Sequence, residues 1–370
     1  MTTNSYNTYI KNIAYYVVFI MMFVILINFT VDPGNIYPKL SIQKDNVTLK
    51  THIEELLGSE YGVFMPSGIN ERSIKKALAE YPINYDCAVI GSSHVMQISA
   101  VRKHNSLQDI CLSMKNLGVS GGSLEDYLAL SNIILNNTKY LPKTIVFGVD
   151  PWSLKLNQES KWVEYEQDYL DMRKELLQSI SSSNLASKSL ILNLINLQYF
   201  KRSLIALFTD SVSSTSTPVP KFDYSNGLIR AVTLPDGSLV YSSENIENNK
   251  ESIKKISGKH NYKIVKDKFY HPHAVELFQK LITHLKTKGI DVVLVLTPYH
   301  HKVWSIKSQP IIGVMKAVEK RVHDLAESLE IQVIGSYNPN IVGCLPDEFY
   351  DAMHAKSECL EKLDRFYKKH

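Results

Sequence analysis

The first pattern in the chain is a stretch without charged residues between Lys11 and Asp32, which is apolar along almost its whole length. At about 1.5 Å per residue, a helix of this length matches the roughly 30 Å hydrocarbon core of a bilayer. A cleaved signal peptide would have a shorter apolar region and a small-residue cleavage site, which residues 28–34 (NFTVDPG) do not provide. The pattern predicts an uncleaved transmembrane anchor over residues 13–31. A buried core helix is the alternative, but the rest of the chain is not apolar enough to cover one on all sides.

The remainder of the chain alternates short apolar runs with amphipathic helical patterns. The runs are rich in β-branched residues, as strands buried on both faces should be. They fall at 86–90 (DCAVI), 110–114 (ICLSM), 144–149 (TIVFGV), 291–297 (DVVLVLT) and 331–335 (IQVIG). Helical patterns fall at 124–136, 272–288, 310–330 and 355–368. This alternation favours right-handed crossovers, so the expected fold class is α/β with a doubly wound parallel sheet.

Two interruptions of this alternation set the expected domain organisation. Residues 1–12 form a tail before the anchor, and the polar residues 32–80 are expected as a stalk that packs onto the main domain. Residues 155–270 do not fit the alternation and are expected as an insertion that caps a site. Within them, TLPDGSLVY predicts a hairpin with Asp236 and Gly237 in its turn. The α/β domain then consists of residues 81–154 and 271–370.

Composition narrows the class of protein. The 370 residues are 44% hydrophobic and 21% charged, which is typical of a globular protein and excludes a disordered or collagen-like chain. The formal net charge is only +4 and no arginine-rich stripe is present, so nucleic acid is not expected as a partner. Lys11 precedes the anchor while Lys39, Lys44 and Lys50 follow it. This count does not favour a cytoplasmic N-terminus, although long domains translocate largely regardless of such charges.

The four cysteines show no CxxC spacing, so neither a zinc site nor a thioredoxin-like redox motif is expected. No metal and no cofactor are predicted. Cys87 and Cys111 lie within strand patterns and are expected as small buried apolar residues rather than as a disulfide. Cys344 and Cys359 flank a loop with candidate chemistry. A disulfide between them requires an oxidising compartment.

Polar residues follow the predicted strands, at the edge of a doubly wound sheet where ligands bind. The first strand is followed by residues 91–94 (GSSH), which contain Ser93, and Asp351 and His354 lie just before the last helical pattern. A serine at a strand-to-helix turn is exposed beside backbone N–H groups, as a nucleophile needs; a helix N-cap is the alternative role. Three residues of separation let the Asp351 carboxylate hold one nitrogen of the histidine ring and orient the other toward the serine.

The order of these motifs resembles the SGNH hydrolase superfamily, in which a serine follows the first strand and Asp-x-x-His lies near the C-terminus. The resemblance covers residues 81–152 and 271–370 and implies a flavodoxin-like sheet. Ser93 matches the family's nucleophile, with Ser92 in place of the usual aspartate. Asp351 and His354 match the orienting acid and the base.

Residues 116–121 (NLGVSG) are similar to the family's N-x-x-x-S-G motif, which implies that Gly121 is an oxyanion donor. A tight turn that needs glycine is the alternative role. The backbone N–H of Ser93 would be the second donor. The family's third motif carries an asparagine that donates to the oxyanion, but here Val149 stands in that place, and a valine cannot donate. Loss of one such donor typically costs about 10²–10³ in rate.

Four further residues near the ligand edge are expected to contact substrate, with core packing or a solvated loop as the alternative: His94, Asp150, Tyr299 and His300. The combination of an anchor with these motifs is similar to membrane-anchored SGNH-like proteins of bacterial envelopes, including those of lipoteichoic-acid D-alanylation and polysaccharide acetylation. This similarity implies a serine esterase or O-acyltransferase outside the cytoplasmic membrane. Its expected partners are an envelope glycan, an acyl donor and a multi-pass membrane acyltransferase. The alternative is a glycan-binding or assembly protein that has lost turnover.

Overall fold

The computed structural model describes most of the chain: residues 3–31, 46–66, 69–102, 107–137, 139–155, 164–177, 194, 195, 197, 200, 201, 203, 204, 216–255, 271–305 and 310–367. Residues 32–45 of the predicted stalk lie outside the described residues, as do large parts of the predicted insertion.

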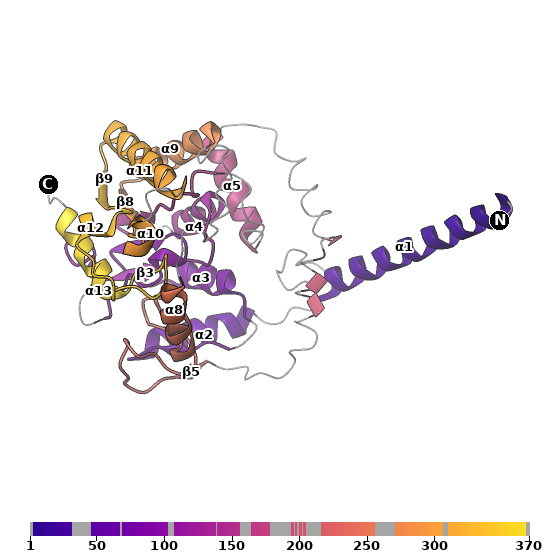
Figure 1. Ribbon diagram of the computed structural model, residues 1–370, viewed down its shortest axis with the longest axis horizontal. Coiled ribbons are helices and arrows are strands. Elements are labelled where there is room, and N and C mark those ends of the chain that lie inside the picture. Colours follow the sequence, from indigo (N-terminus) through magenta and orange to yellow (C-terminus); the bar gives the residue numbers. More distant parts are fainter. Residues whose placement is uncertain are drawn as a thin grey trace.

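A parallel five-stranded sheet forms the centre of the fold (Figure 1). Its order is β3-β2-β4-β8-β9, so the first strand along the chain lies between the second and the third. All four pairings are parallel. The predicted fold class, α/β with a parallel sheet, is confirmed. The strands are β2 (Cys87–Ile90), β3 (Met114–Asn116), β4 (Thr144–Gly148), β8 (Asp291–Leu296) and β9 (Gln332–Gly335).

Both faces of this sheet are covered, because alternate residues of each strand enter different cores. Ala88 and Ile90 of β2 belong to the larger core, while Cys87 and Val89 belong to the smaller one. The larger core contains apolar side chains of α4 (Leu124–Asn136), α5 (Glu166–Leu177), α9 (Pro272–Thr287) and α11 (Pro310–Leu329). The smaller core contains those of η1 (Ser93–Val95), α12 (Pro339–Val342), α13 (Ser357–Leu360) and η3 (Glu361–Phe366).

The second strand differs from the prediction. It was expected at 110–114 but runs over Met114–Asn116. Cys111 is fully buried in the smaller core and bonded to Cys87, so the apolar run that precedes β3 packs below the sheet instead of joining it. The polar residue Lys115 interrupts the apolar pattern of this strand, so the sequence did not predict it. The side chain of Lys115 is buried because its amine donates to the carbonyl oxygens of Ala79 and Tyr81.

The last predicted helix, 355–368, is also different. The structure has a short α13 followed by the 3-10 helix η3. Leu360 and Leu363 are both fully buried in the smaller core. A spacing of three residues brings successive side chains onto one face of a 3-10 helix, which suits this packing.

Residues 46–80 belong to the folded unit. α2 (Asn46–Gly58) and α3 (Glu71–Glu80) bury Ile53, Leu56 and Leu78 in the larger core. Between them, β1 (Val63–Phe64) joins a second, small sheet of order β5-β1-β6-β7. The other strands of this sheet come from the predicted insertion: β5 (Thr217–Pro218), β6 (Val232–Thr233) and β7 (Leu239–Val240). β6 and β7 form the predicted hairpin around Asp236 and Gly237.

All four cysteines are paired, in the disulfides Cys87–Cys111 and Cys344–Cys359. The expectation that Cys87 and Cys111 are unbonded is therefore wrong. Both side chains are fully buried, as expected, but the turn before β3 brings Cys111 beneath β2 with a Cα–Cα distance of 5.6 Å to Cys87. Sequence separation of 24 residues gave no signal for this proximity.

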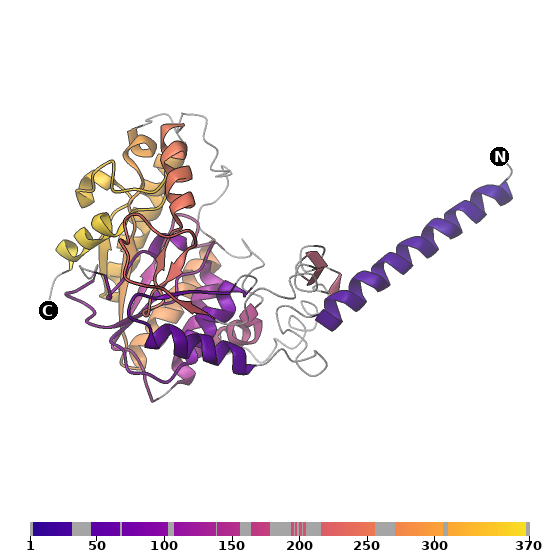
Figure 2. The ribbon, with the colours of Figure 1, turned by 90° about the horizontal axis from the view of Figure 1, so that it is seen from below.

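The N-terminal helix α1 (Thr3–Val31) projects away from the folded domain in both views (Figures 1 and 2). Its segment Lys11–Val31 is long and apolar enough to span a membrane, with a mean hydropathy of 2.3. The helix starts before the predicted boundary at residue 13, because residues 3–12 contain no proline or glycine that would end it. Most of its described side chains are exposed.

Candidate active site

The turn between β2 and η1 presents Ser93 at the carboxyl end of the sheet. Ser92 is the N-cap of η1, and its Oγ accepts a hydrogen bond from the backbone N–H of His94 at 3.2 Å. Because Ser92 caps the helix, the hydroxyl of Ser93 is left for another contact. The capping role considered for Ser93 thus belongs to its neighbour.

Three glycines allow η1 to lie directly on the edge of the sheet. A Cβ at Gly91, Gly118 or Gly148 would lie 2.8, 2.9 or 2.1 Å from a methyl group of Val95 in η1. These glycines belong to the ends of β2 and β4 and to the loop after β3. The position of Ser93 is therefore set by the close approach of three neighbouring segments.

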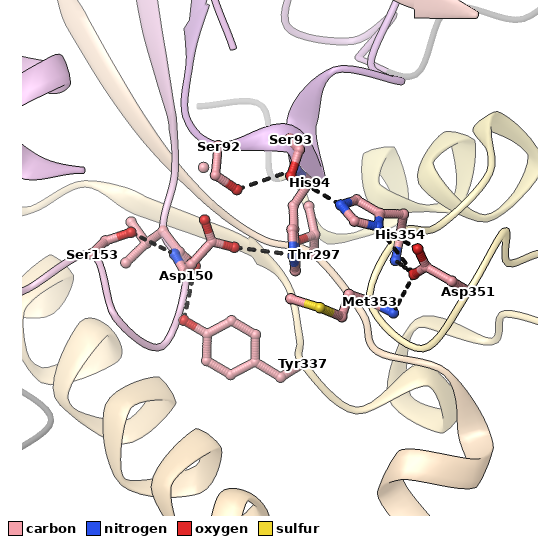
Figure 3. A network of polar contacts seen from close by, with 12 residues as sticks. Ser92, Ser93, His94, Asp150, Ser153, Thr297, Tyr337, Asp351, Met353 and His354 are labelled. Atoms are coloured by element: carbon pink, nitrogen blue, oxygen red, sulfur yellow. Dashed lines mark hydrogen bonds and ion pairs between the residues drawn. The ribbon is translucent and has the colours of Figure 1, made fainter. Parts of the chain in front are cut away.

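Ser93, His354 and Asp351 form one line of contacts (Figure 3). Ser93 Oγ lies 2.9 Å from His354 Nε2, and His354 Nδ1 lies 2.8 Å from Asp351 Oδ2. An ionised carboxylate accepts from Nδ1–H, which leaves Nε2 able to accept the proton of the serine hydroxyl. The three residues that the sequence predicts to act together are thus brought together by the fold, and all three are partly exposed.

The Asp351 carboxylate is held by its own loop. Its Oδ1 accepts from the backbone N–H groups of Met353 at 2.7 Å and His354 at 2.8 Å. Burial alone would raise the pKa of the Asp351 carboxyl. The hydrogen bond and charge of His354, together with these N–H groups, have the larger effect and bring the pKa below its usual value. The carboxylate therefore stays ionised at neutral pH and fixes the orientation of the imidazole.

Each disulfide encloses a segment that carries part of this line. Cys87–Cys111 encloses Ser93, and Cys344–Cys359 encloses Asp351 and His354. Cys344, Glu348 and Cys359 are also close enough to suggest a metal site. The two cysteines have no thiolate to offer while they are bonded, and Glu348 is paired with the amine of Lys362. This cluster therefore has no free ligand set.

The loop that contains Gly121 lies beside the Ser93 turn. Val119 N–H donates to Gly91 O at 3.0 Å, and a Cβ at Gly122 would lie 2.4 Å from the same oxygen. Gly121 has φ +63°, so the turn considered as its alternative role does require a glycine. Among the described residues, no hydrogen bond is formed by the N–H of Gly121 or Ser93, and both groups stay available as the predicted donors.

Val149 provides no donor. Its side chain is buried in the larger core, its N–H donates to Val295 O at 2.9 Å, and its carbonyl accepts from Tyr337 Oη at 2.8 Å. The residue that stands in place of the family's asparagine is thus part of the packed sheet edge.

His94 and Asp150 form a buried pair behind His354. His94 Nδ1 lies 3.2 Å from Asp150 Oδ1 and 3.3 Å from Thr297 Oγ1. Burial lowers the pKa of the His94 imidazole well below its usual value, so the ring is neutral. Burial raises the pKa of the Asp150 carboxyl to about 7, although Ser92 and the charge of His354 act in the opposite direction. Burial therefore makes the Asp150 carboxyl hold its proton more tightly than an exposed aspartate does.

The four expected substrate contacts have almost no exposed surface. His94 and His300 are 2% exposed, Asp150 is 1% exposed and Tyr299 is fully buried. Direct contact with substrate does not fit these positions. His300 instead holds the loop of the acid and base, because its N–H donates to Ala352 O at 3.1 Å and its ring lies 3.1 Å from Pro346 O.

Several residues that support the site gave no recognisable signal in the sequence. The amide of Asn116 donates to the carbonyl oxygens of Val95 and Ile98 at 2.8 Å, which holds the chain on the far side of η1. Lys75 of α3 donates to Asn116 O at 2.9 Å and to Gly237 O in the hairpin. These contacts join α3 to the hairpin and to the end of β3, which are far apart in the chain, so no local sequence pattern predicts them.

The hairpin of the insertion reaches the site itself. Asp236 accepts hydrogen bonds from Ser99 Oγ and the N–H of Ala100, just beyond η1. Tyr241, immediately after β7, is partly exposed, and its ring centroid lies 6.1 Å from that of His354. The insertion thus supports the segment after η1 through Asp236. It also places the ring of Tyr241 as an aromatic wall next to His354.

No protein-family model matches the chain, and a search of curated proteins gives no match. The resemblance to the SGNH hydrolases therefore stays a prediction, and function has to be inferred from the residues of the site.

Proposed function

We propose that the protein is a membrane-anchored serine acyl-transfer enzyme, an esterase or an O-acyltransferase, that acts on acyl esters of envelope glycans. The contact that carries this proposal is the line from Ser93 Oγ to His354 Nε2 and from His354 Nδ1 to Asp351. A serine hydroxyl is a weak nucleophile unless a base lies within hydrogen-bond reach and a third group orients that base. Here both conditions are met.

In the first half of the reaction, Ser93 Oγ attacks the ester carbonyl carbon while His354 Nε2 takes the hydroxyl proton. The tetrahedral intermediate collapses, the carbon–oxygen bond of the leaving alcohol breaks, and His354 gives that alcohol the proton. In the second half, the acceptor loses a proton to His354 and attacks the acyl-serine. Ser93 is then released with its proton restored. Asp351 stays ionised and stabilises the imidazolium in both halves.

The acceptor decides the outcome: water gives hydrolysis, and a sugar hydroxyl gives transfer. The available oxyanion donors are the backbone N–H groups of Ser93 and Gly121, without a side-chain donor at Val149. A hole with one donor fewer costs rate in both halves of the reaction. A bound acceptor offsets part of this cost in the second half, because its hydroxyl is held beside the acyl-serine. The Tyr241 wall suits such an acceptor, because an aromatic ring offers an apolar face beside a polar group.

The fold and the disulfides support the family and the location that we propose. Within the central sheet the strand order along the chain is 2-1-3-4-5, the order of flavodoxin-like sheets. Paired cysteines persist in oxidising compartments and are rare in the cytosol. With α1 as the anchor, these bonds favour a catalytic domain on the outer side of the cytoplasmic membrane.

The proposal is tested by following release and transfer of an acetyl group from an activated acetyl ester, with the full-length protein in detergent and with a glycan acceptor present or absent. We expect activity in the wild type and none in Ser93→Ala. Ser92→Ala is the matched control, because it removes a neighbouring serine hydroxyl that does not contact His354. It loses the N-cap of η1, at a cost of about 1 kcal/mol of stability, but should keep measurable activity. Circular dichroism confirms that each variant is folded. Equal rates for the wild type and Ser93→Ala would favour the glycan-binding or assembly role.

A further inference from the structure

A second apolar stretch lies within the insertion. Between Glu175 and Asp210 the sequence contains no acidic residue, and its only cations are Lys188, Lys201 and Arg202. Residues 190–208 read LILNLINLQYFKRSLIALF, which is apolar at most positions. A stretch with leucine, phenylalanine and basic residues but no acids has the composition of a helix that lies in a membrane interface.

The described residues of this stretch pack against the end of α1 that is nearest to the folded domain. The Asn28 amide donates to Leu194 O at 2.8 Å, and its carbonyl oxygen accepts from Ser203 Oγ at 3.1 Å. The rings of Phe23 and Phe200 meet edge to face, with centroids 6.1 Å apart. The two segments are therefore joined by polar and aromatic contacts, and short helical pieces are visible beside α1 in Figures 1 and 2.

In a bilayer spanned by Lys11–Val31, the Asn28 contacts lie near one edge of the hydrocarbon core, and the Phe23 contact lies deeper. Asn28 is three residues before Val31, where α1 ends, and Phe23 is eight residues before it. At 1.5 Å per residue, they lie about 5 Å and about 12 Å from the helix end. A polar side chain at such a depth needs a protein partner, because lipid offers none. The stretch supplies that partner, since Asn28 is fully buried against it.

The same stretch keeps apolar surface exposed. Leu197 is 72% exposed and Ile195 is 40% exposed, and Lys201 beside them is exposed as well. Exposed leucine and isoleucine next to a membrane span, with cations and without acids, match a surface of lipid tails and anionic headgroups.

We infer that Leu197 and Ile195 form a second membrane contact, in which both side chains enter the edge of an anionic bilayer while Asn28 joins their segment to the anchor. The insertion is then attached to the membrane at one end and to the active site at the other, through Asp236 and Tyr241. This inference rests on α1 spanning the membrane, and it does not depend on the enzymatic activity.

The test measures contact with lipid at single positions in the full-length protein, reconstituted into vesicles of phosphatidylcholine and phosphatidylglycerol. Leu197→Cys is labelled with an environment-sensitive fluorophore, and the native cysteines do not react because they are bonded. Brominated lipid then quenches probes that lie among acyl chains. Ile20→Cys, in the middle of the span, is the positive control. Leu112→Cys is the matched negative control, since Leu112 is 80% exposed on the folded domain.

We expect loss of fluorescence at positions 20 and 197 and none at position 112. Quenching at position 20 with none at position 197 would overturn the second membrane contact and leave the anchor standing. Absence of quenching at both positions would show that α1 does not span the bilayer, and the inference would fail with it.

Discussion

The imidazole rings of His94 and His354 lie edge to face, with their centroids 5.0 Å apart and their planes at 62°. His354 is the predicted base, and it is in contact with Ser93 and Asp351. His94 has no contact with Ser93 Oγ in this line, but its ring lies between His354 and the buried carboxyl of Asp150 (Figure 3). From this packing we expect His94 to hold the imidazole of His354 in its alignment with Ser93.

His94→Ala should lower kcat and leave KM nearly unchanged. The buried ring cannot reach substrate, but its loss opens a cavity beside His354 and lets the base leave its alignment with Ser93. Steady-state kinetics with an activated ester separates the two parameters. A raised KM with an unchanged kcat would instead support the direct substrate contact that the sequence suggested.

Asp150→Asn should remove a pH dependence of stability. In the unfolded chain this carboxyl ionises near its usual value, whereas in the folded protein it keeps its proton up to about pH 7. The folded state binds the extra proton in that window, so the contribution of Asp150 to stability decreases as pH rises through it, by at most about 1.4 kcal/mol per pH unit. The asparagine cannot titrate. Thermal unfolding of both proteins at about pH 5 and about pH 7 measures the difference; a difference that does not change with pH would contradict it.

Gly148→Ala should displace the nucleophile segment. The new Cβ would lie 2.1 Å from Val95 Cγ1, so η1 must move, and overpacking of this kind costs about 1–3 kcal/mol. We expect a lower unfolding temperature and a lower kcat. Gly313→Ala is the matched control, since no atom lies within 4 Å of its Cβ in α11 and helix propensity favours alanine by about 0.5–1 kcal/mol. Equal effects of the two changes would show that the glycine contact does not position Ser93.

The double variant Cys344→Ser, Cys359→Ser should lose activity as well as stability. The bridge closes a loop with a sequence separation of 15 that carries Asp351 and His354, and loops of this size contribute about 3 kcal/mol. Cys87→Ser, Cys111→Ser is the comparison. It should lose stability but retain more kcat, because the sheet and Gly91, Gly118 and Gly148 still hold Ser93. Full activity without the Cys344–Cys359 bridge would contradict this role.

The sequence predicts the central sheet well because its strands are short, apolar and β-branched. β4 and β8 and the helix α4 lie where their patterns place them. β3 was misplaced because a buried lysine interrupts the strand pattern and a buried cysteine extends the preceding run. A pattern of apolar and polar residues treats every lysine as exposed. It therefore misses Lys115, whose amine is buried and donates to carbonyl oxygens.

The candidate site was predictable only in part. Ser93 directly follows β2, at the carboxyl edge of the parallel sheet where ligands bind. Asp351 and His354 lie in the segment between α12 and α13, so their approach to Ser93 was expected from the order of the motifs and not from a strand end. The supporting contacts of Asn116, Lys75 and the hairpin join segments far apart in the chain, and no spacing encodes them. The burial of Tyr299 and His300 was missed for a related reason. Residues that follow a strand are expected in an exposed loop, but here segments from elsewhere in the chain cover them, as the contact of His300 with Ala352 shows.

The most direct test of the account is the site of covalent modification by a fluorophosphonate, a reagent that reacts with activated serines. Peptide mass spectrometry of the full-length protein in detergent should find one adduct, on Ser93. The adduct should be lost in His354→Ala and persist in Ser92→Ala. No adduct in a folded wild-type protein, or an adduct on another serine that persists in His354→Ala, would contradict an activated Ser93 and with it the proposed acyl transfer.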